Sequence, residues 1–248
     1  MARKRHLNNA PITEALIDFR VVTPTSFSAE AFLSLKPILA ERYPIVEERR
    51  GFETQFALGK GSPPKSQFKD LGIHGYFFKT SDGLHIAQFR SDGFTFNRLK
   101  PYTAWENILP EALRLWKLYI DLVSPESVSR LAVRYINHIT IPSPVGDFSN
   151  YLTTPPMVPS ELPQNVSSFL VRLVIHDSNL ELAANITQAL EKGIDPSSVT
   201  IIFDIDAYKA GEFDPNGEEI VNLLNMLRNF KNDIFFNSLT EKTVGAYE

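Results

Sequence analysis

The sequence lacks the residues and spacings on which the commonest catalytic and metal sites depend. It contains no cysteine, which excludes disulfide bonds, thiol nucleophiles and thiolate zinc sites. None of its five histidines stands at the H-x-x-x-H or H-E-x-x-H spacing of a helix-borne zinc site. The G-x-S-x-G and Rossmann glycine patterns are also missing. We therefore predict no cofactor, no metal site and no catalytic residue, although an active site can still assemble from residues that are distant in sequence.

One glycine-rich stretch looks superficially like a phosphate-binding loop. Gly59-Lys60-Gly61-Ser62 is followed by two prolines. A phosphate-binding loop instead opens directly into a helix, whose N-terminal amides hold the phosphates. We expect an ordinary loop here.

The chain also lacks a strong charge of either sign and any long apolar run. Its formal net charge is −4, whereas a dedicated duplex-DNA-binding domain is usually strongly basic. No apolar run approaches the ~18 residues that span a bilayer. The basic start, residues 1–6, is followed by Leu7-Asn8-Asn9-Ala10-Pro11 rather than by the apolar segment of a secretory signal. We expect a cytoplasmic protein without a membrane partner.

The first half of the chain alternates apolar and polar residues in several short stretches, which is the periodicity of strands. Residues 11–22 form the first stretch, and Ser28 can cap a following helix that Pro37 would kink or end before Arg42. A weaker strand over residues 45–59 precedes a β-meander whose connections both contain the Asp-Gly hairpin signal. The meander strands are expected at 73–80, 84–90 and 93–99, before a helix that has capping-box spacing between Thr103 and Glu106 and ends near residue 123.

The second half repeats this order with one exception. A strand over residues 130–141 is followed by a proline-rich loop, residues 142–165, where the first half has its helix. Strands are expected at 168–176 and 198–208, and residues 180–190 fit a strand and a helix about equally. The short link before residue 180 favours a strand there, in a hairpin. A final amphipathic helix follows Pro215-Asn216-Gly217.

The order of elements predicts an α+β protein with antiparallel sheets and long packed helices. Two degenerate β-α-β4-α halves are expected, residues 1–125 and 126–248, either as separate halves or as one continuous domain. This order resembles the duplicated unit of TATA-binding-protein-like and helix-grip folds, in which a long helix lies across an antiparallel sheet. Paired ferredoxin-like units are the alternative, although their β-α-β-β-α-β order fits less well.

Charged residues of both signs occupy the polar positions of strands whose other positions are apolar. Such residues suit either an exposed sheet face, which is a natural binding surface, or a buried ion-pair network. Asp204 and Asp206 share one strand face, but a hard cation needs about six oxygen ligands and only two are apparent, so we expect no metal there. The candidate binding residues on this face are Asp18, Arg20, Arg134, Arg172, Asp204 and Asp206.

Two further positions are candidates for binding. Arg98 lies among Asn97, Lys100 and Tyr102, and basic residues beside aromatic ones can hold single-stranded nucleic acid. The same residue types are typical of a turn before a helix, which we favour here. His138 and His176 lie at the ends of expected strands and meet only if those strands pair.

Several stretches of the chain resemble a sporadically distributed bacterial family of proteins of about 250 residues, known mainly by a numbered signature. The resemblance implies the scattered, mobile-element-like distribution that is common among defence and toxin–antitoxin components. The family has no established activity to transfer. The stretches are Asn9-Ala10-Pro11-Ile12-Thr13-Glu14-Ala15, then Phe94-Thr95-Phe96-Asn97-Arg98-Leu99 with Pro101, Tyr102 and Trp105, then Val133-Arg134-Tyr135-Ile136-Asn137, Asp204-Ile205-Asp206 and Leu239-Thr240-Glu241.

These observations favour a non-enzymatic binding or interaction protein, with a protein partner or self-association through the mixed-charge face. An accessory or neutralising component of a bacterial defence module would fit the resemblance. A first alternative is a hydrophobic-ligand pocket under the long helices, because the chain has 18 phenylalanines. The others are nucleic-acid recognition through the sheet face, and a hydrolase or nuclease that depends on Asp204 and Asp206.

Overall fold

A computed structural model describes residues 1–57, 65–193 and 195–248 of the chain. The described residues form nine strands. They are β1 (Ile12–Val22), β2 (Ile45–Ala57), β3 (Lys65–Lys79), β4 (His85–Arg90), β5 (Gly93–Leu99), β6 (Ser127–Pro142), β7 (Leu170–Asp177), β8 (Leu182–Lys192) and β9 (Ser198–Phe213). The helical elements are η1 (Ala29–Leu35), α1 (Lys36–Leu39), α2 (Trp105–Val123), η2 (Phe148–Asn150), α3 (Glu219–Ser238) and α4 (Glu241–Gly245).

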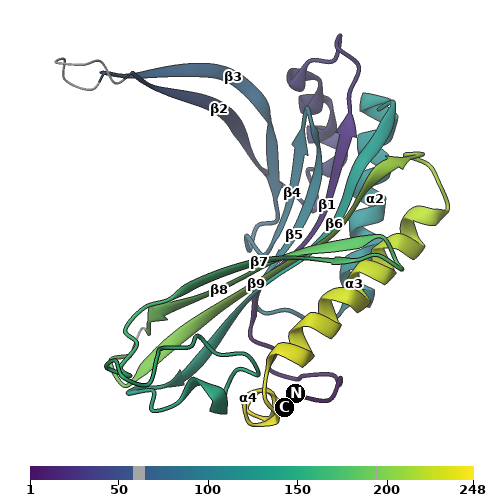
Figure 1. Cartoon of the computed structure of the whole chain (residues 1–248). Coiled ribbons are helices and arrows are strands. Elements are labelled where there is room, and N and C mark those ends of the chain that lie inside the picture. Colours follow the sequence, from purple (N-terminus) through teal and green to yellow (C-terminus); the bar gives the residue numbers. More distant parts are fainter. Residues whose placement is uncertain (58–64, 194) are drawn as a thin grey trace.

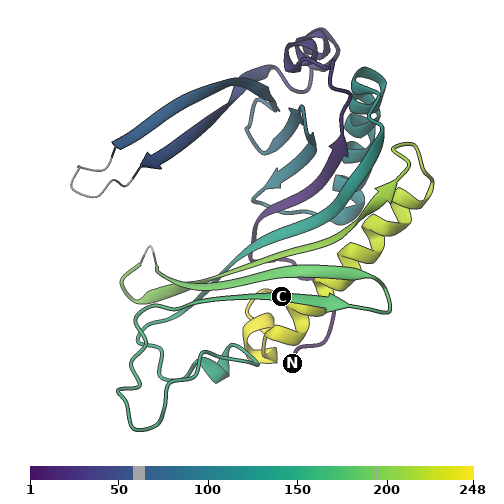
Figure 2. The same ribbon diagram turned by 45° about the horizontal axis from the view of Figure 1, so that its top comes forward.

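In the described chain all nine strands belong to one antiparallel sheet, in the order β2-β3-β4-β5-β1-β6-β9-β8-β7. The central strands β1 and β6 are neighbours, and each is flanked by the strands of its own half of the chain (Figure 1). The sheet is therefore continuous across the expected boundary near residue 125. The pair β2–β3 projects away from the rest of the sheet (Figure 2).

The two long helices cover one face of the sheet. α2 packs against β5, and α3 lies across β6 and β9 (Figure 1). We call the opposite face, which neither long helix covers, the open face. The predicted α+β class is confirmed, and the segment expected at residues 180–190 forms a strand, β8, which begins at Leu182. No helix in the described ranges combines the length and apolar character needed to cross a membrane.

Two helices differ from their predictions, whereas α3 follows Pro215-Asn216-Gly217 as expected. α2 begins at Trp105, and Ala104 occupies the N-cap position without a side-chain hydrogen bond. Thr103 instead accepts a hydrogen bond of 3.4 Å from Asn107 Nδ2. The helix expected after Ser28 is a 3₁₀ segment followed by one α-helical turn, because Pro37 cannot donate to the preceding turn.

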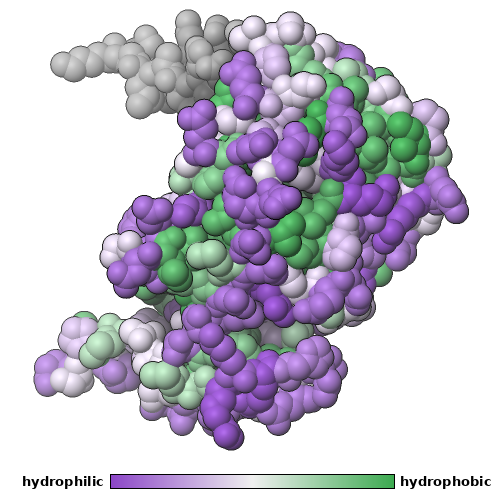
Figure 3. Space-filling model, turned by 90° about the vertical axis from the view of Figure 1, so that its right-hand side faces the viewer, coloured by the Kyte–Doolittle hydropathy of each residue, from purple (hydrophilic) through white to green (hydrophobic). Residues whose placement is uncertain are grey.

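The core lies between the sheet and its helices. Ala15, Ile17 and Phe19 of β1 are fully buried there, as their alternation predicts. Trp116 of α2 stacks on Phe19 with ring centroids 4.2 Å apart and on Tyr119 at 5.2 Å. Trp116 is thus a core residue. Seen from the helix side, the surface is largely polar and is interrupted by apolar areas (Figure 3).

Candidate functional site

The open face gathers the charged residues of the central strands. Asp18 of β1, Arg134 of β6 and Asp206 of β9 point to this side, because their apolar neighbours are buried against the helices. Arg134 makes a two-pronged contact with Asp204, with bonds of 2.8 and 2.6 Å. The bond to Asp204 is the main reason why the pKa of Arg134 is raised.

A second pair of the same kind lies beside the first. Arg130 donates from Nη2 to both carboxylate oxygens of Asp206, at 2.9 and 2.7 Å. Asn185 of β8 donates to the same carboxylate at 3.1 Å. Both aspartates of the predicted D-x-D pair are therefore engaged by arginines. Within the part of the chain that the structure describes, no group of three or more metal-ligating side chains is placed to hold a metal.

Asp18 is the centre of a more deeply buried network. Its Oδ1 accepts hydrogen bonds from Arg90 at 3.1 Å and from Thr95 Oγ1 at 2.6 Å. Arg20 and Arg130 lie 3.3 and 3.5 Å from Oδ2. Arg90 is only 3% exposed, so its charge depends on these carboxylate partners.

Asp92, in the turn between β4 and β5, extends this network. Burial alone would raise its pKa, but the charges of Arg90 and Arg20 outweigh burial and lower the pKa. His74 Nε2 lies 3.2 Å from Asp92 Oδ1, and Ser91 Oγ lies 2.9 Å from His74 Nδ1.

Ser91, His74 and Asp92 have the residue types of a nucleophilic triad, but their surroundings do not support that role. The Asp92 carboxylate is already paired with two arginines. It is therefore not available to orient and stabilise the His74 imidazole alone, as a triad requires. Ser91 also does not line the neighbouring hollow of the open face. We interpret the three residues as a turn that fixes the β3–β4–β5 meander.

That hollow has a volume of about 440 Å³. Its arginines are matched by aspartates within the network, so little positive charge remains to attract phosphates. Nucleic-acid recognition through this face therefore gains no support, since phosphate binding relies on unpaired cations. The lining residues are Leu16, Asp18, Arg20, Gln88, Arg90, Thr95, Arg130, Arg134 and Asp206.

Arg98 lies on the other side of the sheet. It is buried on the helix side, where its Nη1 is 3.5 Å from His85 Nδ1. Burial, followed by the charge of Arg98, lowers the pKa of His85. Asn97, one residue earlier, faces the open side and donates to Glu14. The basic and aromatic cluster considered around Arg98 does not form, because successive strand residues point to opposite faces.

The remaining candidates lie farther out on the open face. His138 is exposed opposite Ile202, and Arg172 is exposed on the outer strand β7. His138 and His176 do not meet, because β9 and β8 separate β6 from β7.

The feature that the sequence did not reveal is the edge strand β7. Among the described residues its one neighbouring strand is β8, and its apolar side chains are exposed on both faces. Leu170 is 73% exposed, Leu173 52% and Val174 50%. The apolar residues on either side of Arg172, between residues 170 and 175, predicted a strand. No local pattern could show that this strand would lie at the edge of the sheet.

Every second residue of β7 turns its backbone N–H and C=O groups away from β8. Leu190 N donates to Phe169 O at 3.0 Å, so Phe169 and every second residue after it face β8. In an antiparallel ladder the alternate residues turn their N–H and C=O groups to the other side. These outward-facing residues are Leu170, Arg172, Val174 and His176.

Neither a comparison with models of known protein families nor a search of curated proteins finds a significant match for this chain. The resemblance to a sporadic bacterial family therefore stays a prediction, and the function has to be argued from the geometry described above.

Proposed function

We propose that the protein is an interaction module that receives an extended segment of a partner polypeptide at the free edge of β7. One observation supports this most directly: a strand at the edge of the sheet exposes large apolar side chains on both faces. An exposed, flat, apolar edge is a template for pairing with another strand.

The energetic argument rests on what a partner strand would cover. It would pair the outward N–H and C=O groups of four residues, which are otherwise left to water. It would also bury part of Leu173 and Val174, and each 100 Å² of apolar surface removed from water is worth roughly 2.5 kcal/mol.

The opposite edge of the sheet, β2, has features that hinder pairing with another strand, and β7 lacks them. The described part of β2 presents charged residues, and its register shifts between Arg49 and Arg50. Arg50 is bound to Asp70 at 2.7 Å. In β7 the pairing with β8 is unbroken, and Arg172 is its only arginine or lysine. Charges and bulges of this kind normally prevent edge-to-edge pairing, so the unprotected β7 edge supports a binding role.

The strand order also supports the finer architecture that the sequence suggested. Two β-sheet halves meeting at β1 and β6, each with a long helix on the same side, are consistent with a duplicated, TATA-binding-protein-like arrangement. In this proposal the paired charges of the open face hold the two halves together. A role in a bacterial defence module stays a prediction.

The first partner to test is a second copy of the chain, because it brings an identical apolar strand. Sedimentation velocity across a micromolar concentration series, with and without a synthetic peptide of residues 168–178, measures both self-association and strand addition. Val174→Pro removes an outward N–H that the β7–β8 ladder does not use, so it should abolish association while the protein stays folded.

A matched pair of substitutions separates the edge from general surface hydrophobicity. Val174→Lys should also abolish association, whereas Val221→Lys, at a 38% exposed valine of α3, should leave it unchanged. Equal behaviour of the two lysine variants, or a wild-type protein that binds neither itself nor the peptide, would contradict the proposed function.

A further inference from the structure

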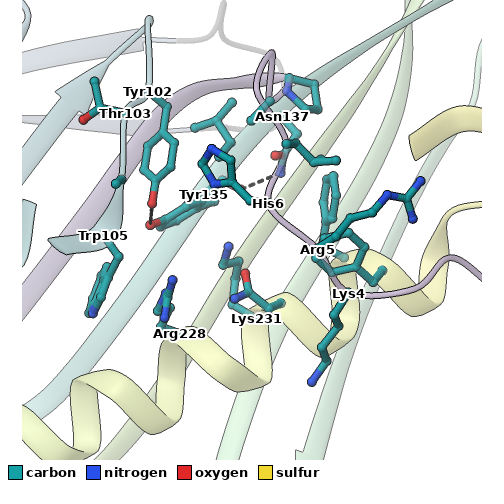
Figure 4. A pocket seen from close by; sticks show the side chains of 18 of the residues that line it. Lys4, Arg5, His6, Tyr102, Thr103, Trp105, Tyr135, Asn137, Arg228 and Lys231 are labelled. Atoms are coloured by element: carbon teal, nitrogen blue, oxygen red, sulfur yellow. Dashed lines mark hydrogen bonds between the residues drawn. The ribbon is translucent and has the colours of Figure 1, made fainter. Parts of the chain in front are cut away.

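A pocket of about 350 Å³ lies at the other side of the sheet, beneath the N-terminal segment. Its walls come from that segment, from the stretch between β5 and α2, from β6 and from α3 (Figure 4). Figure 4 shows Arg228 and Lys231 projecting from α3 toward Tyr102 and Tyr135. The pocket is independent of β7 and of the open-face network.

Lys231 is the unusual residue of this pocket. It is 5% exposed, and its ammonium lies 3.6 Å from the centre of the Tyr135 ring. No carboxylate in the described ranges forms an ion pair with it, and burial followed by the charge of Arg228 lowers its pKa to about 7. A buried cation without a carboxylate partner is costly, and a single cation–π contact offsets only part of that cost.

The other cations of the pocket are better neutralised. Lys4 is paired with Asp233, and Arg5 with Glu241 and Glu248. Arg228, one turn before Lys231 on the same side of α3, has one ion-pair partner in the described part of the chain, Glu106, at 3.6 Å.

Glu106 is largely exposed, with 70% of its side chain accessible. Solvent therefore weakens its hold on Arg228. A net positive charge is left where Arg228 and Lys231 face the cavity.

The wall beside these two cations is largely aromatic. The hydroxyl groups of Tyr102 and Tyr135 are 2.9 Å apart and hydrogen-bonded. Burial raises the pKa of each, so both stay protonated. One hydroxyl donates to the other, and the O–H of the accepting hydroxyl is left to donate to a ligand. Trp105 adds a flat surface whose Nε1 is already bound to Asn225 at 2.9 Å. An aromatic or aliphatic skeleton fits such walls, and a polar group fits the hydroxyls.

We propose that this pocket binds a small organic anion, with its anionic oxygens at Lys231 Nζ and the Arg228 guanidinium and its carbon skeleton against the aromatic walls. Phosphate monoesters and carboxylates share the required chemistry, since both present several acceptor oxygens to an ammonium and a guanidinium. The pocket lies under a long helix, as the hydrophobic-ligand alternative expected. Its cationic lining selects an anion instead of a purely apolar molecule.

In the empty protein the buried charge of Lys231 lowers the stability of the fold. In the complex the same charge strengthens the binding of the anion. The variant Lys231→Met keeps the length of the side chain and removes the charge. It should raise the Tm by at least roughly 3 °C near pH 6.5 and should weaken ligand binding at least tenfold. Lys117→Met, at an exposed lysine paired with Asp121, is the control and should change neither.

Isothermal titration with phenyl phosphate, benzoate, inorganic phosphate and phenol tests the ligand class. Phenyl phosphate and benzoate should bind, inorganic phosphate more weakly, and phenol at least tenfold more weakly than phenyl phosphate. Binding of phenol as tightly as phenyl phosphate, unchanged binding in Lys231→Met, or no binding of any anion at millimolar concentration would each overturn the proposal.

A pH series tests it without a change at Lys231. Benzoate keeps its charge above pH 5, and the variant His6→Gln removes the imidazole that also lines the pocket, so the affinity in this variant should follow the protonation of Lys231. We expect a plateau below pH 7 and a fall approaching tenfold for each pH unit above it. A flat profile between pH 6 and 9 would exclude Lys231 as the anion-binding group, even if Lys231→Met failed to fold.

Discussion

The open face and the Lys231 pocket each contain a buried cation, Arg90 and Lys231, and the two regions differ in how their cations are paired. On the open face Arg134 meets Asp204, Arg130 meets Asp206 and Arg90 meets Asp18. In the pocket Lys231 meets an aromatic ring and a second cation. Internally paired charges have little attraction left for a ligand, whereas an unpaired ammonium in a cavity keeps most of it. Pairing, more than the number of charges, distinguishes a structural site from a binding site.

The two edges of the sheet differ in a parallel way. The described part of β2 carries charged residues and a register shift, whereas β7 pairs with β8 without a shift and exposes large apolar side chains. In each comparison contacts within the chain stabilise or protect one region. The other region leaves groups that a ligand or a partner strand can bind.

Lys231→Met should produce the largest change in stability. The pKa of Lys231 is about 7 in the folded protein against an ordinary value of 10.5, so the folded state binds fewer protons between these two values. Below pH 7 the wild type therefore bears the full cost of the buried charge, on the order of 4 kcal/mol, and regains stability as the pH rises. Urea unfolding at pH 6, 8 and 9.5 measures this.

The variant should be more stable than the wild type at pH 6, and the difference should shrink steadily toward pH 9.5. Parallel stability profiles for the two proteins would mean that Lys231 is paired in solution. The pocket and the open face would then no longer differ in how their cations are paired.

Asp18→Ala should produce the next largest effect, in the opposite direction. It removes a carboxylate from Arg90, which is 3% exposed and keeps Asp92 as its one remaining ion-pair partner among the described residues. Breaking a buried ion pair leaves an uncompensated charge, so we expect a loss of about 3 kcal/mol in the free energy of unfolding. Denaturant titration at pH 7 measures it, and a loss below about 1 kcal/mol would show that Asp92 alone satisfies Arg90.

The sequence predicted the face of β1, β6 and β9 correctly, because alternation in a strand fixes which side each residue takes. Asp18, Arg134 and Asp204 could be placed together from this parity alone. The partner of each charge could not, since it depends on the register between strands that are far apart in the chain. Arg98 and Asn97 are adjacent in the sequence, and that proximity suggests one candidate site. They lie on opposite faces of the sheet, because successive strand residues alternate in direction.

Local sequence patterns could not predict the pocket or the β7 edge, because both depend on the packing of segments that are far apart in the chain. Lys231 occupies the third position after Arg228 in an amphipathic helix, where a lysine is ordinarily solvated. Only the packing of α3 under the N-terminal segment, more than 200 residues away in sequence, buries it. The edge position of β7 follows from the strand order of the whole sheet.

The backbone pattern of β7 makes a smaller, residue-specific prediction. The amides of Arg172 and Val174 face outward and should exchange with solvent at least about tenfold faster than those of Val171 and Leu173, which face β8. Hydrogen exchange followed by NMR resolves these positions. The 168–178 peptide should protect Arg172 and Val174 selectively, and protection of both in the dilute monomer would show that the edge is already covered.

Arg134 and Asp204 should give the smallest effect, although their contact has the best geometry on the open face. Arg134 has 43% of its side chain exposed, so solvent screens the pair and its coupling energy should stay below about 1 kcal/mol. Arg134→Ala, Asp204→Ala and the double variant form the cycle that measures it, by denaturant unfolding. Association through β7 should be unchanged in all three. A coupling energy above about 2 kcal/mol would mean that a partner covers this face in solution, and the open face would then be a binding surface rather than a structural one.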